Sequence, residues 1–338
     1  MALTLEPLQP EQIANWDALI ADFPARQVFH RQAWFNCLVE SQQAEWKYWA
    51  VLEGGRTVGF FSGGVIQRGP FRVFGSPLRT WHTSNMGPLL GGEVDGQAFV
   101  KALDELARRE GFAMMEIEYP TMPHAAYEAA GFNVHQTWTH QLPLTTDINA
   151  MLHRMSNGRK HGIRKSQRNG LEVVECPEAA ELVYDQLSRA LAAKGARVPF
   201  SAEFPQAVVR NLKAIRRVFT LGVRNAEGQI LAVGIFPWDN GTVYLWDCSS
   251  EIEGRNLHPN DLLHWGLMQR AAERGLTLYD MSGYGRFNRA FGAQLVATHR
   301  WNKCYSLAAR SARSIYGELL KWERRSSSIA RLLRPVLK

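Results

Sequence analysis

The fold is decided by two adjoining stretches in the second half of the chain, VFTLGVRNAEGQILAVGIFPWDNGTVYLWD (218–247) and PNDLLHWGLMQRAAERGLTLYDM (259–281). Alternating and β-branched residues in the first stretch predict an antiparallel meander that ends in a strand at 242–247. The second stretch predicts a helix with apolar residues four positions apart, followed by a strand at 276–281. Because a strand, a helix and a strand of this length form a right-handed parallel crossover, both strands should end at the same edge of one sheet.

This order of elements, a meander that feeds one parallel crossover, resembles the GNAT acetyltransferase superfamily, and most closely its Fem-type (FemAB-like) branch. The resemblance rests on RKHGIRKSQRNGLEV (159–173), PFSAEF (199–204) and HPNDLLHWGLMQRAAERGLTLYDMSGYGRFNRAFG (258–292). It implies a mixed α/β fold in which the parallel strands splay apart and hold an acyl donor. It also implies an acyltransferase, since this branch includes the aminoacyl transferases of peptidoglycan cross-bridges and acyltransferases of polysaccharide gene clusters.

The first half of the chain repeats the same pattern. KYWAVLEGGRTVGFFSGGVI (47–66) reads as a strand, a Gly-rich turn and a strand, and LDELARREGFAMMEIE (103–118) matches the later helix and strand, with Glu116 against Asp280. Two tandem copies of one fold explain the repeat, and tandem domains are what the Fem-type branch has. The sequence therefore predicts an α/β protein of two GNAT-like domains, each with a mostly antiparallel mixed sheet and one parallel crossover. The predicted boundaries are 1–145 for the N-terminal domain, 146–305 for the C-terminal domain and 306–338 for a basic amphipathic helix and tail.

The first copy carries a longer insert, GPFRVFGSPLRTWHTSNMGPLL (69–90), which is rich in Gly, Pro, Ser and Asn. Arg79, Trp81 and His82 are interleaved in it, so it is a loop that could line a cleft between the copies. We therefore regard Trp81 and His82 as substrate-binding candidates. The alternative is a solvated loop with one anchoring tryptophan.

Acyl transfer needs a group that takes the proton of the acceptor and donors that stabilise the oxyanion. Asp247 and Asp280 come at the ends of the two parallel strands and are the candidates for the base, with Tyr284 on the following loop as a third catalytic candidate, because ligands gather at this edge of open α/β sheets. The alternative is that these carboxylates cap a loop or pair with Arg286 or Lys303. The further substrate-binding candidates of this region are Trp246, Asn260, Arg286, Asn288 and Lys303.

Positive charge is concentrated in two segments. The chain has a formal net charge of +7, and residues 151–170 hold Arg or Lys without any acidic residue, as 300–338 do with only two. Such segments fit a phosphate-bearing partner, namely tRNA, a nucleotide sugar or a lipid pyrophosphate, or an anionic membrane that the C-terminal tail could reach. Arg159, Arg164 and Lys165 are the candidate phosphate contacts. A solvated helical face and a frayed charged terminus are the alternatives.

The donor site departs from that of ordinary acetyl-CoA enzymes. These carry a Gly-rich loop whose backbone amides bind the CoA pyrophosphate at a helix N-terminus, whereas SSEIEGRNLHPND (249–261) has one glycine and two glutamates. The aromatic residue that is Tyr127 in the first copy is Phe287 in the second. We therefore expect aminoacyl-tRNA as the donor ahead of acyl-CoA. We expect no metal and no other cofactor, since neither the histidines nor the cysteines show metal-ligand spacing.

Three functions fit the sequence. The first is a Fem-type transferase that moves an aminoacyl or acyl group to an amine on a cell-envelope precursor or a small metabolite. The second is an acyl-CoA-dependent acyltransferase of exopolysaccharide biosynthesis, and the third is a non-catalytic scaffold that binds polyanions. The N-terminus has no signal-peptide pattern, and no run of 18 apolar residues predicts a transmembrane segment. We expect a cytoplasmic protein, with the inner membrane surface as the site that its tail could reach.

Overall fold

A computed structural model describes residues 2–92, 94–119 and 124–311 of the chain. The tail beyond residue 311, for which the sequence predicts most of the amphipathic helix and a membrane contact, lies outside the described residues. The strands are β1 (Leu3–Pro7), β2 (Glu45–Glu53), β3 (Arg56–Arg68), β4 (Phe71–Ser76), β5 (Leu89–Leu90), β6 (Met114–Glu118), β7 (Asn133–Pro143), β8 (Glu172–Glu175), β9 (Val218–Arg224), β10 (Ile230–Asp239), β11 (Thr242–Tyr244), β12 (Asp247–Ser250), β13 (Leu278–Asp280) and β14 (Gln294–Cys304). The α-helices are α1 (Pro10–Ala14), α2 (Trp16–Leu19), α3 (Gln32–Gln42), α4 (Gly96–Arg109), α5 (His124–Ala129), α6 (Ile148–Arg154), α7 (Asn157–Arg168), α8 (Ala179–Ala192), α9 (Glu203–Ala214), α10 (Pro259–Glu273) and α11 (Arg286–Arg289).

One mixed sheet runs through the described residues in the order β1-β2-β3-β4-β6-β14-β7-β13-β11-β10-β9-β8, with β5 beside β3 and β12 beside β10. Two of its strand pairs are parallel, β4 with β6 and β11 with β13, and the others are antiparallel. Each parallel pair is joined by a helix, α4 in the first half and α10 in the second. The mixed α/β fold predicted from the sequence is therefore confirmed.

The two parallel pairs place one acidic residue each at equivalent positions. Gly75 of β4 lies opposite Glu116 of β6, and Tyr244 of β11 lies opposite Asp280 of β13. The second pair ends there, because the Leu245 amide donates to the carbonyl of Asp280 at 2.8 Å and the chain then leaves β13 to continue as β12. The strand predicted at 242–247 is thus interrupted after Tyr244. The interruption opens the sheet beside Asp280, as the family resemblance implies.

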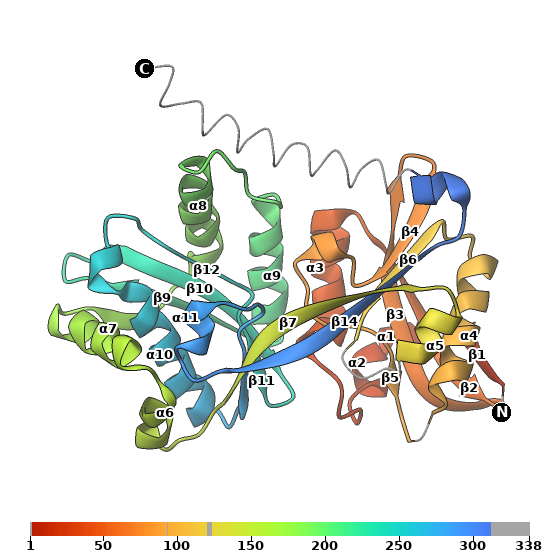
Figure 1. The fold of residues 1–338 in the computed structure, drawn as a ribbon, viewed down its shortest axis with the longest axis horizontal. Helices are drawn as coiled ribbons and strands as arrows, with labels where there is room; N and C mark the ends of the chain where they lie inside the picture. The colour runs from red at the N-terminus through yellow and green to blue at the C-terminus, as the bar shows by residue number, and fades with distance from the viewer. Residues whose placement is uncertain (1, 93, 120–123, 312–338) are drawn as a thin grey trace.

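The halves of the chain share their two longest central strands. β7, from the first half, pairs with β13 of the second, and β14, from the end of the described chain, pairs with β6 of the first. β7 and β14 also pair with each other from Gln294 opposite Gln141 to Asn302 opposite Asn133. They run side by side between the two lobes (Figure 1), and in the space-filling view the yellow residues of β7 cross this junction. The division into domains at residue 145 stays a prediction, while the sheet itself is continuous.

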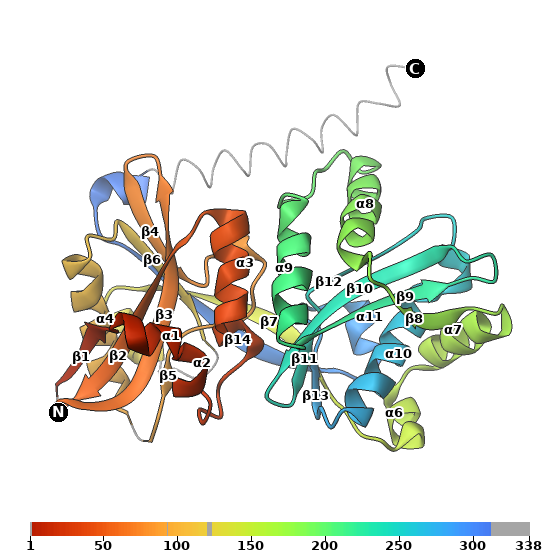
Figure 2. The same ribbon diagram turned by 180° about the vertical axis from the view of Figure 1, so that it is seen from behind.

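Helices α3 and α9 close the junction from the opposite side (Figure 2). Beside them, the buried carboxylate of Asp239 in the second half binds three guanidinium groups, those of Arg26, Arg31 and Arg217. Arg26 and Arg31 belong to the first half, so this cluster joins the halves, and these cations hold the pKa of Asp239 below its ordinary value despite its burial.

Among the helices of the described chain, none has both the length and the apolar run that crossing a bilayer requires.

Candidate active site

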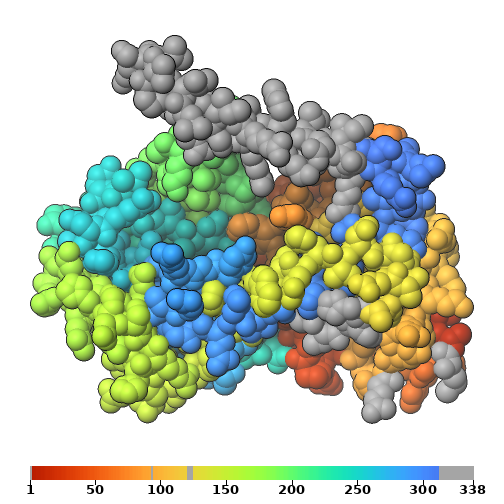
Figure 3. All heavy atoms as spheres, viewed as in Figure 1, coloured from red at the N-terminus to blue at the C-terminus, as the bar shows by residue number. Residues whose placement is uncertain are grey.

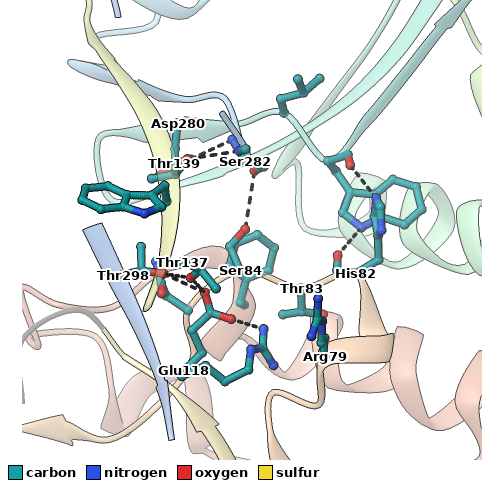
Figure 4. A pocket seen from close by; sticks show the side chains of 17 residues that line it. Arg79, His82, Thr83, Ser84, Glu118, Thr137, Thr139, Asp280, Ser282 and Thr298 are labelled. Carbon is teal, nitrogen blue, oxygen red and sulfur yellow. Dashed lines mark hydrogen bonds and ion pairs between the residues drawn. The ribbon is translucent and has the colours of Figure 1, made fainter. Parts of the chain in front are cut away.

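A cavity of about 230 Å³ lies where the two halves meet (Figure 4). Its walls come from the insert of the first half, the ends of β6 and β13, the segment after β11, and the middle of β7 and β14. The residues that line it are Phe29, Arg79, His82, Thr83, Ser84, Asn85, Glu118, Thr137, Trp138, Thr139, Leu245, Trp246, Asp280, Ser282, Gly283, Thr298 and Arg300. Three of the predicted site residues, His82, Trp246 and Asp280, are thus brought to one cavity.

Asp280 is the carboxylate at the point where the parallel strands separate. It is only 2% exposed, and its Oδ1 accepts hydrogen bonds from the Thr139 hydroxyl at 2.6 Å and the Ser282 amide at 2.9 Å. Its Oδ2 accepts from the side-chain amide of Gln141 at 2.9 Å. All three donors are neutral, and no ion pair among the described residues involves Asp280. The cavity therefore has a wall carboxylate that is rigidly held and that no cation of the described residues neutralises.

Glu118, on the opposite wall, is held differently. Its Oε1 accepts from the Thr298 hydroxyl at 2.9 Å, and its other oxygen pairs with the guanidinium of Arg300. Arg300 also donates to Glu116 at 2.6 Å. Sequence reasoning missed Glu118, Arg300 and the threonines of β7. The alternation of polar residues in QTWTHQ (136–141) could have indicated a polar strand face, but only the shared sheet brings that face to Asp280.

His82 and Asp247 connect the insert of the first half to the separated strand of the second. His82 Nε2 lies 3.1 Å from the carbonyl oxygen of Trp246 and 3.7 Å from Asp247 Oδ2. In return, the Trp246 indole donates to the carbonyl of His82 at 2.9 Å. Burial raises the pKa of Asp247, and the nearby charge of His82 acts against that rise. Asp247 is not part of the cavity wall and lies behind His82 and Trp246.

The N-terminus of α10, where GNAT enzymes bind the CoA pyrophosphate, is occupied by groups of the chain itself. The buried carboxylate of Asp261 in the first turn of α10 pairs with Arg159 of α7. Gly162 lies so close to Asp261 that a side chain at this position would collide with the carboxylate. The Ser166 hydroxyl donates to the carbonyl of Leu257 at 2.7 Å. α7 is therefore packed onto the start of α10, in keeping with the missing Gly-rich loop.

Arg159, predicted as a phosphate contact, has its charge engaged inside the protein. Its guanidinium pairs with Asp261 and stacks 4.2 Å above the ring of Phe287. Arg164 is exposed, Lys165 is half-buried, and neither forms an ion pair with a residue that the structure describes. Asn260, at the start of α10, donates to the Ser250 hydroxyl at 3.1 Å.

The remaining predicted residues do not line the cavity. Tyr284 is 71% exposed and Arg286 is exposed at the start of α11. Asn288 donates to the carbonyl of Gly283 at 3.2 Å. Lys303 pairs with Asp104 of the first half, because its strand, β14, lies beside β6 of that half. Trp81 is fully buried, with its ring centre 5.9 Å from that of Trp46.

Comparisons with known proteins agree with this geometry. Residues 154–291 match the acetyltransferase (GNAT) domain family. No curated protein matches the chain in sequence.

Among solved structures, FemX superposes with a TM-score of 0.67 at 12% identity, over 88% of this chain and 97% of that chain. A tandem GNAT protein from the clavulanic acid biosynthesis pathway gives 0.55 at 16% identity, over 90% and 99%. L-PGS from Bacillus licheniformis gives 0.53 at 13% identity, over 90% and 95%. The fold of these proteins therefore extends over nearly the whole chain.

Proposed function

Since the chain is a GNAT acyltransferase with a Fem-like fold, we propose that it transfers an aminoacyl or acyl group from a carrier to an amine, on a cell-envelope precursor or a small metabolite. The observation that carries this proposal is Asp280, a buried carboxylate without a cationic partner in the described chain, on the cavity wall where the parallel strands separate. In the GNAT fold this gap is where the acyl donor is expected. An acceptor bound in the cavity would then meet the donor beside Asp280.

The walls of the cavity suit an amine. A primary amine enters as an ammonium ion, which is attracted by an uncompensated carboxylate at low local dielectric. Trp138, which is 39% exposed, lines the same cavity, and an indole ring attracts a cation. Because Thr139, Ser282 and Gln141 fix both oxygens of Asp280, the carboxylate can orient the amine without rearranging.

The donor that we propose is aminoacyl-tRNA. The start of α10 is closed by Asp261, Arg159 and Ser166, so it does not offer the open backbone amides that hold a free CoA pyrophosphate. On α7, the exposed side chains of Arg164 and Arg168 form no ion pairs within the described chain and are available to phosphates. The sequence resemblance of 159–173, 199–204 and 258–292 to Fem-type aminoacyl transferases supports the same donor.

Acyl-CoA is the second candidate donor. The tandem GNAT protein from the clavulanic acid pathway was solved in a form described as lacking AcCoA, and it covers 90% of this chain. In this case the thioester would have to be held by contacts other than the usual loop, because residues 249–261 lack the Gly-rich sequence.

Binding of total aminoacyl-tRNA, followed by fluorescence anisotropy, distinguishes the donors. We expect the affinity to fall by about an order of magnitude or more between roughly 50 and 200 mM salt, because bound counterions are released. The double variant Arg164→Glu/Arg168→Glu should weaken binding and transfer strongly. The matched control Arg56→Glu/Lys101→Glu, which changes the charge equally at two exposed positions of the first half, should not.

Salt-insensitive transfer from acetyl-CoA to a panel of small amines, equal in both double variants, would overturn tRNA as the donor. Arg159 is left unchanged in this experiment because its reversal would place a negative charge beside the buried carboxylate of Asp261.

A further inference from the structure

We infer that His82 is the proton acceptor of this transfer and that the carboxylate of Asp247, from the other half of the chain, stabilises the cation that His82 becomes. The inference rests on the proposed function, since it names the group that takes the proton of the acceptor amine. His82 belongs to the insert of the first half, and Asp247 begins β12 of the second. The two residues are 165 positions apart in the sequence and meet only because the halves share one cavity.

The hydrogen bonds of His82 fix its tautomer. Its Nε2 lies 3.1 Å from the carbonyl oxygen of Trp246, and a carbonyl oxygen only accepts, so Nε2 carries the hydrogen. Nδ1 then holds the free lone pair in the neutral ring. No hydrogen bond to Nδ1 is formed within the described chain. Since His82 lines the cavity, this nitrogen is the one able to accept a proton from a bound ligand.

The ring is held in place before any substrate binds. His82 adopts a left-handed backbone conformation with φ of 49°, and the indole of Trp246 donates to its carbonyl at 2.9 Å. The ring centres of Phe200 and Trp246 lie 5.4 and 5.6 Å from that of the imidazole. A base that is fixed in this way loses little entropy when the reacting groups come together.

Asp247 supplies the charge that an imidazolium would need. Its Oδ1 accepts from the amide of Cys248 at 2.8 Å, and its Oδ2 lies 3.7 Å from His82 Nε2. No lysine or arginine of the described chain pairs with it. Other charged groups at the cavity are Arg79 on the same insert, Glu118 and Arg300 on the facing strands, and Asp280. The Nε2 hydrogen goes to the Trp246 carbonyl, so the carboxylate acts through its charge, which stabilises an imidazolium as carboxylates do in other acyl transfers.

The chemistry balances with these two residues. The amine nitrogen attacks the acyl carbonyl, a C–N bond forms, and the C–O bond to the ribose of the carrier breaks. An acceptor that enters as an ammonium ion first releases one proton to solvent, which frees the lone pair for attack. The second proton, lost as the C–N bond forms, moves to His82 Nδ1 and from there to the leaving hydroxyl oxygen. Asp280 is less suited to this step because both of its oxygens already accept hydrogen bonds, and its part is to hold the amine.

NMR of the protein with ¹⁵N-labelled histidine tests this arrangement without any substrate. The resonances of His82 are assigned by their loss in His82→Gln. We expect a ring that carries its hydrogen on Nε2, and we expect Asp247→Asn to shift the Nε2 resonance because the carboxylate lies 3.7 Å from this nitrogen. A ring that carries its hydrogen on Nδ1, or His82 resonances unchanged by Asp247→Asn, would overturn the inference even if no donor had been found.

Transfer from total aminoacyl-tRNA to a panel of small amines supplies the second test. His82→Gln should lower kcat/KM by about 10²-fold or more, with tRNA affinity unchanged, and added imidazole should partly restore His82→Ala. Asp247→Asn should lower kcat with KM little changed, because the charge that stabilises the imidazolium is lost. The control His135→Gln, at an exposed position of β7, should match the wild type. Full activity of His82→Gln contradicts the inference and leaves the proposed function standing, whereas transfer by none of the proteins contradicts the proposed function instead.

Discussion

Each of the two parallel crossovers carries a carboxylate at the equivalent position, but the two carboxylates have different partners. In the first, Glu116 lies opposite Gly75 and binds the guanidinium of Arg300 at 2.6 Å. In the second, Asp280 lies opposite Tyr244 and receives hydrogen bonds from neutral donors alone. An ion-paired buried carboxylate is a structural element, whereas an unpaired one at a cavity is available to a ligand. We therefore propose that the chemistry takes place at the second crossover.

The difference comes from the strand that lies beside each crossover. β6 has β14 as its neighbour, which brings Arg300 directly opposite Glu118, and β13 has β7, which brings Gln141 opposite Asp280. Because the halves exchange these strands, the residue that decides the chemistry of each crossover comes from the other half. The two crossovers thus have the same order of strand, helix and strand, and the strand exchange gives them different neighbours.

The aromatic residues that follow each crossover differ as well. Tyr127 in the first half is fully buried, stacks on Trp301 at 4.4 Å, and its hydroxyl has no hydrogen-bond partner in the described structure. Phe287 in the second half lies beneath the guanidinium of Arg159. The hydroxyl of Tyr127 is therefore enclosed in the core of the first half and does not reach the cavity.

The largest effect on stability should come from Arg300, which contacts two buried carboxylates of the first crossover. Arg300→Met leaves Glu116 and Glu118 facing each other without this cation, and should lower the free energy of unfolding by about 3–5 kcal/mol. Urea denaturation measures the loss, with Arg300→Lys as a control that keeps the charge. A loss below about 1 kcal/mol would mean that this ion pair does not distinguish the crossovers.

Acid should weaken both halves together, since each buries a neutral histidine. Burial lowers the pKa of His30 in the first half to about 4, and burial, with a smaller effect of the Arg159 charge, lowers that of His264 in the second to about 3. The unfolded chain therefore binds these protons at higher pH than the folded one. The stabilisation that comes from keeping these two rings neutral is fully present above the ordinary histidine pKa of 6.5. It is lost as the pH falls toward the pKa values of His30 and His264 in the folded protein.

The expected loss at pH 5 relative to pH 7 is about 2 kcal/mol for each of these histidines. His30→Gln should remove about half of this pH dependence, whatever it does to stability at pH 7. His30 is suited to this test because both of its ring nitrogens are engaged. Its Nε2 donates to the Met86 carbonyl at 2.6 Å and its Nδ1 accepts from the Gln27 amide, so a proton added to Nδ1 would break that hydrogen bond. Equal free energies of unfolding at the two pH values would show that these rings are not held neutral.

The sequence predicts the fold and one wall of the site, and its limits have a physical cause. Alternation and helical spacing are local properties, and they suffice for both crossovers and for the position of Asp280. The pairing of β14 with β6 depends on contacts between distant segments, so Arg300 and Glu118 were missed and Lys303 was wrongly expected near the second crossover. The sequence of α7 likewise cannot tell that Arg159 faces α10 while Arg164 faces solvent.

The most direct test compares Asp280→Asn with Glu116→Gln, the matched changes at the equivalent positions of the two crossovers. Transfer kinetics and thermal unfolding are measured for both proteins with the donor that supports turnover. We expect Asp280→Asn to lower kcat/KM by about 10²-fold with the fold retained, because the amine is no longer held beside the donor, and Glu116→Gln to lose stability while its kcat stays close to that of the wild type. A fully active and stable Asp280→Asn, or a Glu116→Gln that is equally inactive while folded, would contradict the assignment of the chemistry to the second crossover.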